Sequence, residues 1–153
     1  MTHAGPAVPV MRVAQVCRAR VTEEPLDLQQ HAREVERIAA GAIVTFAGVV
    51  RDHDGGRGVT ALDYSCHPRA QAIIERVVTD IASAAAGVRA ISVSHRVGPL
   101  HIGDIALACA VSADHRREAF DVCATLVDEV KAQLPVWKRQ VFTDGSDEWV
   151  NCT

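Results

Sequence analysis

The chain has 153 residues, 48% of them hydrophobic and 23% charged, with a formal net charge of −3. This is an ordinary composition for one folded domain with a proper core. The small negative charge gives no global attraction to nucleic acid or anionic lipid, and no apolar run approaches the roughly 18 residues of a membrane span. We therefore expect neither a nucleic acid nor a membrane as a partner.

Residues 1–9 contain no lysine or arginine and no long apolar segment, so they do not form a secretory signal. We expect a short disordered lead-in over 1–9 and a single domain over 10–153. The chain has five cysteines and no C-x-x-C pair, which fits neither a zinc site nor a disulfide framework. Cys17, Cys109 and Cys123 are expected to pack as small hydrophobic side chains. A reducing cytoplasm is the simplest location for such a chain.

The first elements follow from hydrophobic periodicity and turn residues. Apolar residues alternate with arginines over Val10–Val21, which predicts a half-buried strand with the side chain of Cys17 on its apolar face. Asp27 offers an N-cap for a helix that continues at helical spacing to Ala39. Gly41 is a natural C-terminal stop for this helix.

Two β-rich segments come next, on either side of a turn. Ala42–Val50 is rich in β-branched residues and predicts a buried strand, and Val59–Cys66 predicts a second strand. Between them, the glycines and aspartates of Arg51–Gly58 predict a turn or mobile loop, and therefore a hairpin. Ala70–Ala86 predicts a helix that Gly87 ends, because its branched residues fall on one stripe.

The second half of the chain is interpreted in the same way. Val88–Val97 and Ile105–Ala113 predict strands joined by the turn-rich connection Gly98–Asp104. Asp114 can cap a helix that Pro135 closes, because the residue before a proline resists the helical conformation. The core face of this helix is expected to contain Phe120, Cys123, Leu126, Val127, Val130 and Leu134.

The last segments are an extended stretch over Val136–Phe142, a turn over Thr143–Asp147 and a short strand over Glu148–Val150. The resulting order is β-α-β-β-α-β-β-α-β. This order predicts an α+β domain in which helices pack on a mixed, mostly antiparallel sheet.

Lys131 and Lys138 are the only two lysines, while arginine is used fourteen times. Lysine, unlike arginine, can release its proton when burial or a neighbouring cation favours the neutral amine. The composition suggests that both positions need an amine that titrates or acts as a nucleophile, although an arginine-preferring genome would leave the same pattern by chance. Lys131 lies at the border of the helix's apolar stripe. It is either a surface lysine whose stem covers the edge of the core or an amine held at the rim of a pocket. Lys138 lies on a segment that Pro135 and Trp137 should hold firmly.

A second candidate site is Ser112–Arg117, where a strand end runs into a helix start. Backbone N–H groups and the helix dipole favour an anion there. His115, Arg116 and Arg117 lie in the first turn, where the dipole disfavours cations, so they do not serve helix stability. An anionic ligand such as a phosphate or a carboxylate would account for them, and pairing with nearby acidic residues is the alternative.

The Arg51–Gly58 loop holds Asp52, His53 and Asp54 at the spacing of half a calcium loop, without the glutamate of the twelfth position. A plain turn is the simpler interpretation, and we expect no metal and no cofactor. Arg51 closes the preceding strand, where its side chain would be held in place. The chain has no nucleotide-loop or serine-hydrolase motif, and too few aromatic residues for nucleic-acid stacking.

Several stretches, in order from about Asp27 to Val150, resemble one family. They are G-A-I-V-T-F-A-G-V-V-R-D-H, S-H-R-V-G-P-L-H-I-G-D, A-D-H-R-R-E-A-F, V-K-A-Q-L-P-V-W-K-R and D-E-W-V. At their consistent spacing, these motifs are similar to the large, catalytic subunit of molybdopterin synthase, the MoaE family. The family fold is an α/β hammerhead, which agrees with the predicted element order.

This resemblance implies a sulfurtransferase. A small ubiquitin-like sulfur-carrier subunit, whose C-terminal Gly-Gly ends in a thiocarboxylate, supplies sulfur to cyclic pyranopterin monophosphate. The product is molybdopterin, a dithiolene. The carrier tail enters a pocket of the large subunit. The family complex is a heterotetramer, in which a homodimer of large subunits binds one carrier at each end.

The resemblance also implies roles for individual residues. Lys131 and Lys138 are similar to the family's catalytic lysines. The positions similar to its substrate pocket are Arg51, His115, Arg116, Arg139, Val49, Val50 and Gln140. Val49 stands where the family often has lysine, and Gln140 where it often has glutamate. Cations at such a site suit a phosphate and a thiocarboxylate.

Two other functions remain open from the sequence. The chain could be a non-catalytic anion-binding or carrier-docking module on the same fold, although the presence of both lysines, Arg51 and the His115–Arg116 pair argues against this. It could also be a lysine Schiff-base enzyme, which borohydride trapping with a carbonyl substrate would detect.

Overall fold

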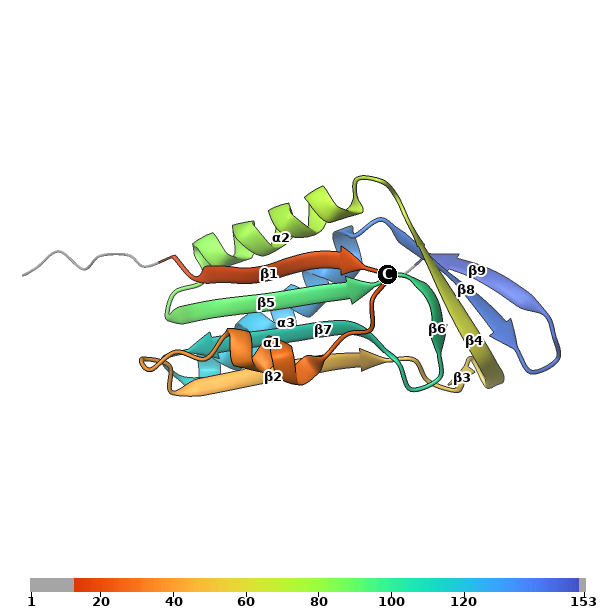
Figure 1. Cartoon of the computed structure of the whole chain (residues 1–153), viewed down its shortest axis with the longest axis horizontal. Helices are drawn as coiled ribbons and strands as arrows, with labels where there is room; N and C mark the ends of the chain where they lie inside the picture. Colours follow the sequence, from red (N-terminus) through yellow and green to blue (C-terminus); the bar gives the residue numbers. More distant parts are fainter. Residues whose placement is uncertain (1–12, 152–153) are drawn as a thin grey trace, which may run out of the picture.

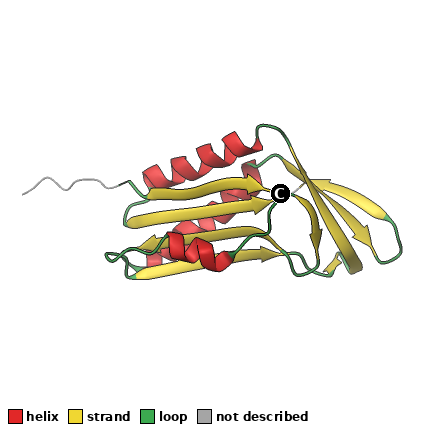
Figure 2. Ribbon diagram, in the orientation of Figure 1, coloured by secondary structure: helices red, strands yellow, loops and turns green. Residues whose placement is uncertain are grey.

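The computed structural model describes residues 13–151, which form three helices and nine strands in two sheets (Figures 1 and 2). The predicted α+β class is therefore confirmed. The expected lead-in over 1–9, the start of the strand predicted from Val10, and Cys152 lie outside the described residues. The single domain expected over 10–153 stays a prediction. None of the helices in the described part of the chain is long and apolar enough to span a membrane.

The first sheet has the strand order β1-β5-β7-β2. Its strands are β1 (Gln15–Thr22), β5 (Val88–Arg96), β7 (Ile105–Ala113) and β2 (Ala42–Val49). β1 runs parallel to β5, and the other pairs are antiparallel. The central strands β5 and β7 are buried. β2 was expected to be buried, which is wrong, because it is an edge strand whose Ile43 is 45% exposed.

Strand β1 does not alternate simply. Its pairing with β5 shifts register between Val16 and Arg18, which marks a β-bulge or irregularity. Ala19 and Val21 pack against the main core, whereas Cys17 packs into a small cluster on the opposite face of the sheet. The predicted shared face of Cys17 and Ala19 is therefore wrong, because the shift in register separates them.

Helices α2 (Ala70–Ala84) and α3 (Arg116–Gln133) cover one face of the first sheet, and α1 (Leu28–Glu34) covers the other (Figure 1). The main core lies between this sheet and the pair α2 and α3. The predicted stripe of α2 is confirmed, with Ile74 and Val78 fully buried.

The core face of α3 is mostly as predicted. Cys123, Leu126 and Val130 are buried, but Phe120 is 59% exposed and Ala119 takes its place in the core. Helical spacing explains this difference. Residues four or seven positions apart lie on the same face of a helix, and Ala119 lies four residues before Cys123 and seven before Leu126. The helix begins after His115 rather than after Asp114, and its N-cap makes no side-chain hydrogen bond.

Helix α1 is shorter than predicted. Asp27 is its N-cap, as expected, and accepts hydrogen bonds from two backbone N–H groups of the first turn. The helix ends at Glu34, however, rather than near Ala39. Gly41 does not stop this helix. A Cβ there would lie 2.6 Å from the carbonyl oxygen of Asp114, so glycine permits a close approach between two backbone segments.

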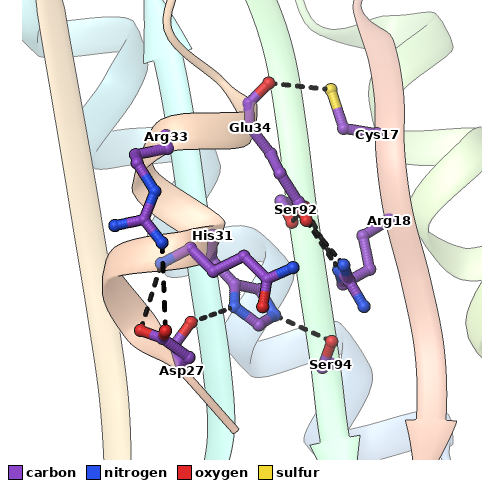
Figure 3. A network of polar contacts seen from close by, with 9 residues as sticks. Cys17, Arg18, Asp27, His31, Arg33, Glu34, Ser92 and Ser94 are labelled. Atoms are coloured by element: carbon purple, nitrogen blue, oxygen red, sulfur yellow. Dashed lines mark hydrogen bonds and ion pairs between the residues drawn. The ribbon is translucent and has the colours of Figure 1, made fainter.

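Beneath α1 lies a network of paired polar side chains (Figure 3). The Nδ1–H of the buried His31 donates to the carbonyl oxygen of Asp27 at 2.7 Å, and Nε2 accepts from Ser94 Oγ at 2.8 Å. Glu34 accepts hydrogen bonds from the guanidinium of Arg18 and from Ser92 Oγ. The Arg18 guanidinium holds the pKa of Glu34 below its ordinary value.

The second sheet lies at one end of the first (Figure 1). It contains β3 (His53–Asp54), β4 (Arg57–Cys66), β6 (Gly98–His101), β8 (Val136–Phe142) and β9 (Asp147–Asn151). β4 pairs with β3, β6 and β8, and β8 pairs with β9, always antiparallel.

Three local predictions for this sheet have different outcomes. The turn at Arg51–Gly58 is confirmed, and Gly55 and Gly56 have φ values of 58° and 78°, which the tight two-residue turn between β3 and β4 requires. The hairpin predicted between Ala42–Val50 and Val59–Cys66 is wrong, because β2 pairs with β7 in the first sheet and β4 lies in the second. The connection Gly98–Asp104 contains strand β6, which the sequence missed because Gly98 and Pro99 are typical turn residues.

Candidate active site

A cavity of about 530 Å³ lies where the two sheets meet. One wall is a face of the second sheet. The opposite wall comprises the end of β2, the adjoining ends of β5 and β7, and the last turns of α3. Among the predicted site residues, it brings together Lys131, Lys138, Arg51, Val49, Val50 and Gln140.

Strand pairing explains the second-sheet wall. Tyr64 lies opposite Lys138, and Leu62 lies opposite Gln140. Because alternate residues of a strand share a face, all four side chains belong to the face that lines the cavity. Arg139, between the two on β8, belongs to the other face. Its Nε donates to a carboxylate oxygen of Asp147 at 2.6 Å, and it does not line the cavity.

The two lysines reach the same cavity from different elements. Lys131 lies in the last turn of α3, where the helix dipole favours a cation. The chain then turns at Pro135 and enters β8, which presents Lys138. Lys131 is exposed at the rim and Lys138 is half-buried. Within residues 13–151, neither ammonium group has a carboxylate within ion-pair distance, so both charges are available to an anion.

Asp54 connects the loop after β2 to the cavity wall. Its carboxylate accepts from Arg51 at 3.1 Å and from Gln140 Nε2 at 3.0 Å. The hydrogen bond from Gln140 holds the pKa of Asp54 below its ordinary value, and the charges of Lys138 and Arg51 act in the same direction. Asp54 therefore holds the side-chain amide of Gln140 in place. Arg51 also bonds to Asp54, and it lines the cavity.

Gln140 has one buried polar atom without a partner. The side chain is 2% exposed, and its Oε1 accepts no hydrogen bond from the described residues. Because Nε2 donates to a carboxylate, the orientation of the amide is defined, and Oε1 is the unpaired acceptor. A buried unpaired acceptor is costly, so its presence in a cavity wall suits a ligand that brings a donor.

His95 and Tyr64 line the cavity, and sequence reasoning did not select either residue. Their rings form an edge-to-face pair with centroids 5.1 Å apart. Burial lowers the pKa of His95 to about 4. The hydrogen bond to the carbonyl oxygen of Arg96 opposes this change, and the charge of Lys131 adds to it. The sequence motif S-H-R-V does contain His95, and a histidine in an apolar strand can mark a functional site. The motif alone, however, does not show that this histidine faces a cavity.

His115 and Arg116 lie elsewhere. They line a second, more open hollow with Gly41, Asp114 and Arg117 at the start of α3. Arg116 and Lys131 are separated by most of this helix, about 23 Å at about 1.5 Å per residue. Asp114 pairs with Arg89 at 2.6 Å. The structure therefore does not bring the two predicted groups of site residues together within one chain.

The cavity combines two lysines and an arginine with apolar side chains such as Leu62 and Val136, a chemistry that suits an organic anion. A comparison with protein families identifies the chain further. The model of the family described as "MoaE protein" matches residues 21–133, and the chain belongs to this family. The matched range includes Lys131 and ends before Lys138.

Individual relatives agree with this assignment. The chain is 34% identical to the molybdopterin synthase catalytic subunit of Nostoc sp. over 86% of this chain and 80% of the relative. It is 38% identical to catalytic subunit 1 of Mycobacterium tuberculosis, covering 86% and 88% of the two chains. The crystal structure of molybdopterin synthase from Staphylococcus aureus matches with a TM-score of 0.77 and 30% identity, covering 85% of this chain and 94% of that chain.

Proposed function

We propose that this chain is the catalytic subunit of a molybdopterin synthase, a sulfurtransferase of molybdenum cofactor biosynthesis. It transfers sulfur from a thiocarboxylated small carrier protein to cyclic pyranopterin monophosphate and so forms the dithiolene. The observation that carries the proposal is the convergence of Lys131, Lys138 and Arg51 on one cavity. The family and the names of its relatives support the same reaction.

The cavity suits two anionic reactants. The thiocarboxylate and the cyclic phosphate both carry negative charge, which ammonium and guanidinium groups stabilise by charge-assisted hydrogen bonds. As the carrier's thiocarboxylate becomes a carboxylate, its acyl–sulfur bond breaks and an oxygen from water replaces the sulfur. A lysine can hold the anion as an ammonium group, or as a neutral amine take a proton or attack the acyl carbon. These roles belong to Lys131 and Lys138.

The carrier binds at the second sheet in this proposal. Its C-terminal Gly-Gly has no side chains, so an extended tail can enter the cavity and reach the lysines. Trp149 is 58% exposed on the edge strand β9, and Trp137 on β8 is 39% exposed. Both side chains lie on the face of the second sheet opposite the cavity, the face that also carries Arg139, and they give the carrier an apolar contact surface there. We also propose a cytoplasmic location, for which the free thiols of Cys66, Cys109 and Cys123 give support.

A homodimer would reconcile the two separated groups of cationic residues. If Arg116 and Lys131 serve one substrate, the α3 start of one protomer must approach the cavity of its partner. Ile43 on the edge strand β2 and Phe120 on α3 are large, exposed and apolar, as a homodimer contact requires. We propose that His115 and Arg116 bind the substrate phosphate in this way.

Reconstitution tests the proposed reaction directly. The protein is mixed with a thiocarboxylated carrier and cyclic pyranopterin monophosphate, and dithiolene formation is measured. We expect product with this carrier and none with a carrier that lacks its terminal Gly-Gly. A chain that binds the carrier but forms no dithiolene would be a docking module, and the enzymatic proposal would be wrong.

Mixing two variants tests the shared site. We expect Lys131→Arg and Arg116→Ala each to form dimers with little activity. Random exchange of protomers should restore about a quarter of the active sites, because a mixed dimer contains one intact combination. No recovery after verified exchange would contradict the shared site. A monomer at tens of micromolar in sedimentation would contradict the dimer.

A further inference from the structure

His95 has a defined tautomer. It lies at the end of β5, is 6% exposed and lines the cavity. Its Nδ1 lies 2.8 Å from the carbonyl oxygen of Arg96, which can only accept a hydrogen bond. Nδ1 therefore carries the proton, and Nε2 presents a lone pair. No residue of the described range 13–151 forms a hydrogen bond with Nε2.

The plane of the imidazole is also fixed. The Tyr64 ring meets it edge to face at an interplanar angle of 85°. With one nitrogen bound to the backbone and the ring held by Tyr64, His95 cannot rotate freely. The free acceptor thus has a fixed direction, which is what a residue that orients another group needs.

Lys131 is the cation whose charge acts on His95. The two residues line the same cavity, and the electrostatic effect of Lys131 reaches the imidazole. The other titratable or charged groups of the cavity are Tyr64, Lys138, Arg51, His53 and Asp54. Next to His95 on β5, Arg96 pairs with Asp104 at 3.3 Å. A neutral imidazole adds no further positive charge to this crowded site.

We propose that His95 is a positioning residue whose Nε2 accepts a hydrogen bond from the amine of Lys131 and holds this lysine toward the cavity. The inference deepens the proposed function, because it identifies what orients one of the two lysines. Lys131 lies exposed at the rim, and a long flexible side chain there loses rotamer freedom when it must act at one point. The fixed acceptor reduces that loss before the substrate arrives.

Three substitutions separate the roles of the imidazole. His95→Phe keeps a ring against Tyr64 and removes both nitrogens. His95→Asn keeps a donor for the Arg96 carbonyl and removes the acceptor at the Nε2 position, so it repeats the test should the first variant not fold. His95→Gln places an amide oxygen near the Nε2 position and is the conservative control.

The first experiment does not depend on the enzymatic reaction. The chain has only two lysines, so reductive methylation with ¹³C-formaldehyde labels Lys131 and Lys138 as separate, assignable NMR signals. In His95→Phe and His95→Asn, we expect Lys131 to be methylated about threefold to tenfold faster, the range that one lost hydrogen bond gives, with Lys138 unchanged. His95→Gln should stay within about twofold of the wild type. Equal acceleration of both lysines, or of neither, overturns the proposal.

The second experiment measures coupling during sulfur transfer by the reconstituted complex. We expect His95→Phe to lower kcat about tenfold or more while KM changes within about twofold, as for a lost positioning interaction. In a Lys131→Ala background, His95→Phe should have no further effect, because both changes remove the same interaction. Independent, multiplicative effects overturn the proposal. If the wild type makes no dithiolene, the proposed function fails, and the methylation result still decides the role of His95.

Discussion

Two buried histidines, His31 and His95, lie on opposite faces of the first sheet and differ in how their nitrogens are paired. Ser94 faces α1 and donates to Nε2 of His31, whereas His95 faces the cavity and its own Nε2 has no partner within residues 13–151. Both imidazoles donate from Nδ1 to a backbone carbonyl, at 2.7 Å for His31 and 2.8 Å for His95. The difference therefore lies at Nε2 alone.

The same difference separates the two regions as a whole. Beneath α1, polar groups such as Glu34, Arg18 and Ser92 satisfy one another (Figure 3). At the cavity, Gln140 keeps an unpaired Oε1, and the lysines have no carboxylate partner in the described part of the chain. Paired polar groups stabilise a fold, whereas unpaired ones reduce its stability unless a ligand completes them. The comparison predicts that substitutions beneath α1 affect stability and substitutions at the cavity affect sulfur transfer.

The largest expected effect is on catalysis. Lys131→Arg keeps the positive charge but removes an amine that can titrate or react. If the role of Lys131 is chemical, sulfur transfer should fall by roughly 10² or more, the usual scale of acid–base catalysis, while folding and carrier binding persist. Single-turnover dithiolene formation measures this effect. Near-normal turnover in Lys131→Arg, together with a large loss in Lys131→Ala, would show that the residue is only an electrostatic clamp.

The next effect is a loss of stability in acid. The pKa of His95 is about 4 in the folded chain and 6.5 in an ordinary environment, so the unfolded chain binds a proton first. This contribution to stability is complete above pH 6.5 and declines as the pH falls toward 4. It amounts to about 3 kcal/mol, from about 1.4 kcal/mol per unit of pKa.

His95→Phe isolates the contribution of His95 to the pH dependence of stability, because the variant keeps every carboxylate of the chain. Chemical unfolding of both proteins between pH 7 and pH 4 should show the wild type losing about 3 kcal/mol more than the variant. Parallel curves would mean that the imidazole is already charged or solvated in the folded chain.

A smaller effect is expected beneath α1. Ser94→Ala leaves His31 Nε2 buried without a donor, so the free energy of unfolding should fall by about 1–3 kcal/mol. Because this serine faces away from the cavity, kcat and KM for sulfur transfer should stay within about twofold of the wild-type values. Ser92→Ala is a matched second variant on the same face of the sheet. A specific loss of activity at unchanged stability would contradict the division between the two regions.

The sequence predicted the lysines better than their surroundings. Lys131 and Lys138 follow from composition and family motifs, and the pattern helix, proline, strand places both near one point. His95 could not be predicted, since only the meeting of two sheets shows that its Nε2 lacks a partner. The end of α1 and the exposure of Phe120 were mispredicted because helical spacing does not reveal which turn contacts the sheet. The separation of Arg116 from Lys131 already follows from the predicted helix, because each helical residue adds about 1.5 Å.

The smallest expected change in stability provides the sharpest contrast. Gln140→Leu removes a buried unpaired oxygen and also the donor to Asp54, which keeps its bond to Arg51. These effects oppose each other, so the free energy of unfolding should change by less than about 1 kcal/mol, in contrast to Ser94→Ala. Sulfur transfer should nevertheless decrease, because the cavity loses a fixed acceptor. Calorimetry and the dithiolene assay on both variants measure the two quantities. A large loss of stability in Gln140→Leu would mean that Oε1 has a partner in solution, and the distinction between a paired and an unpaired region would not hold at this residue.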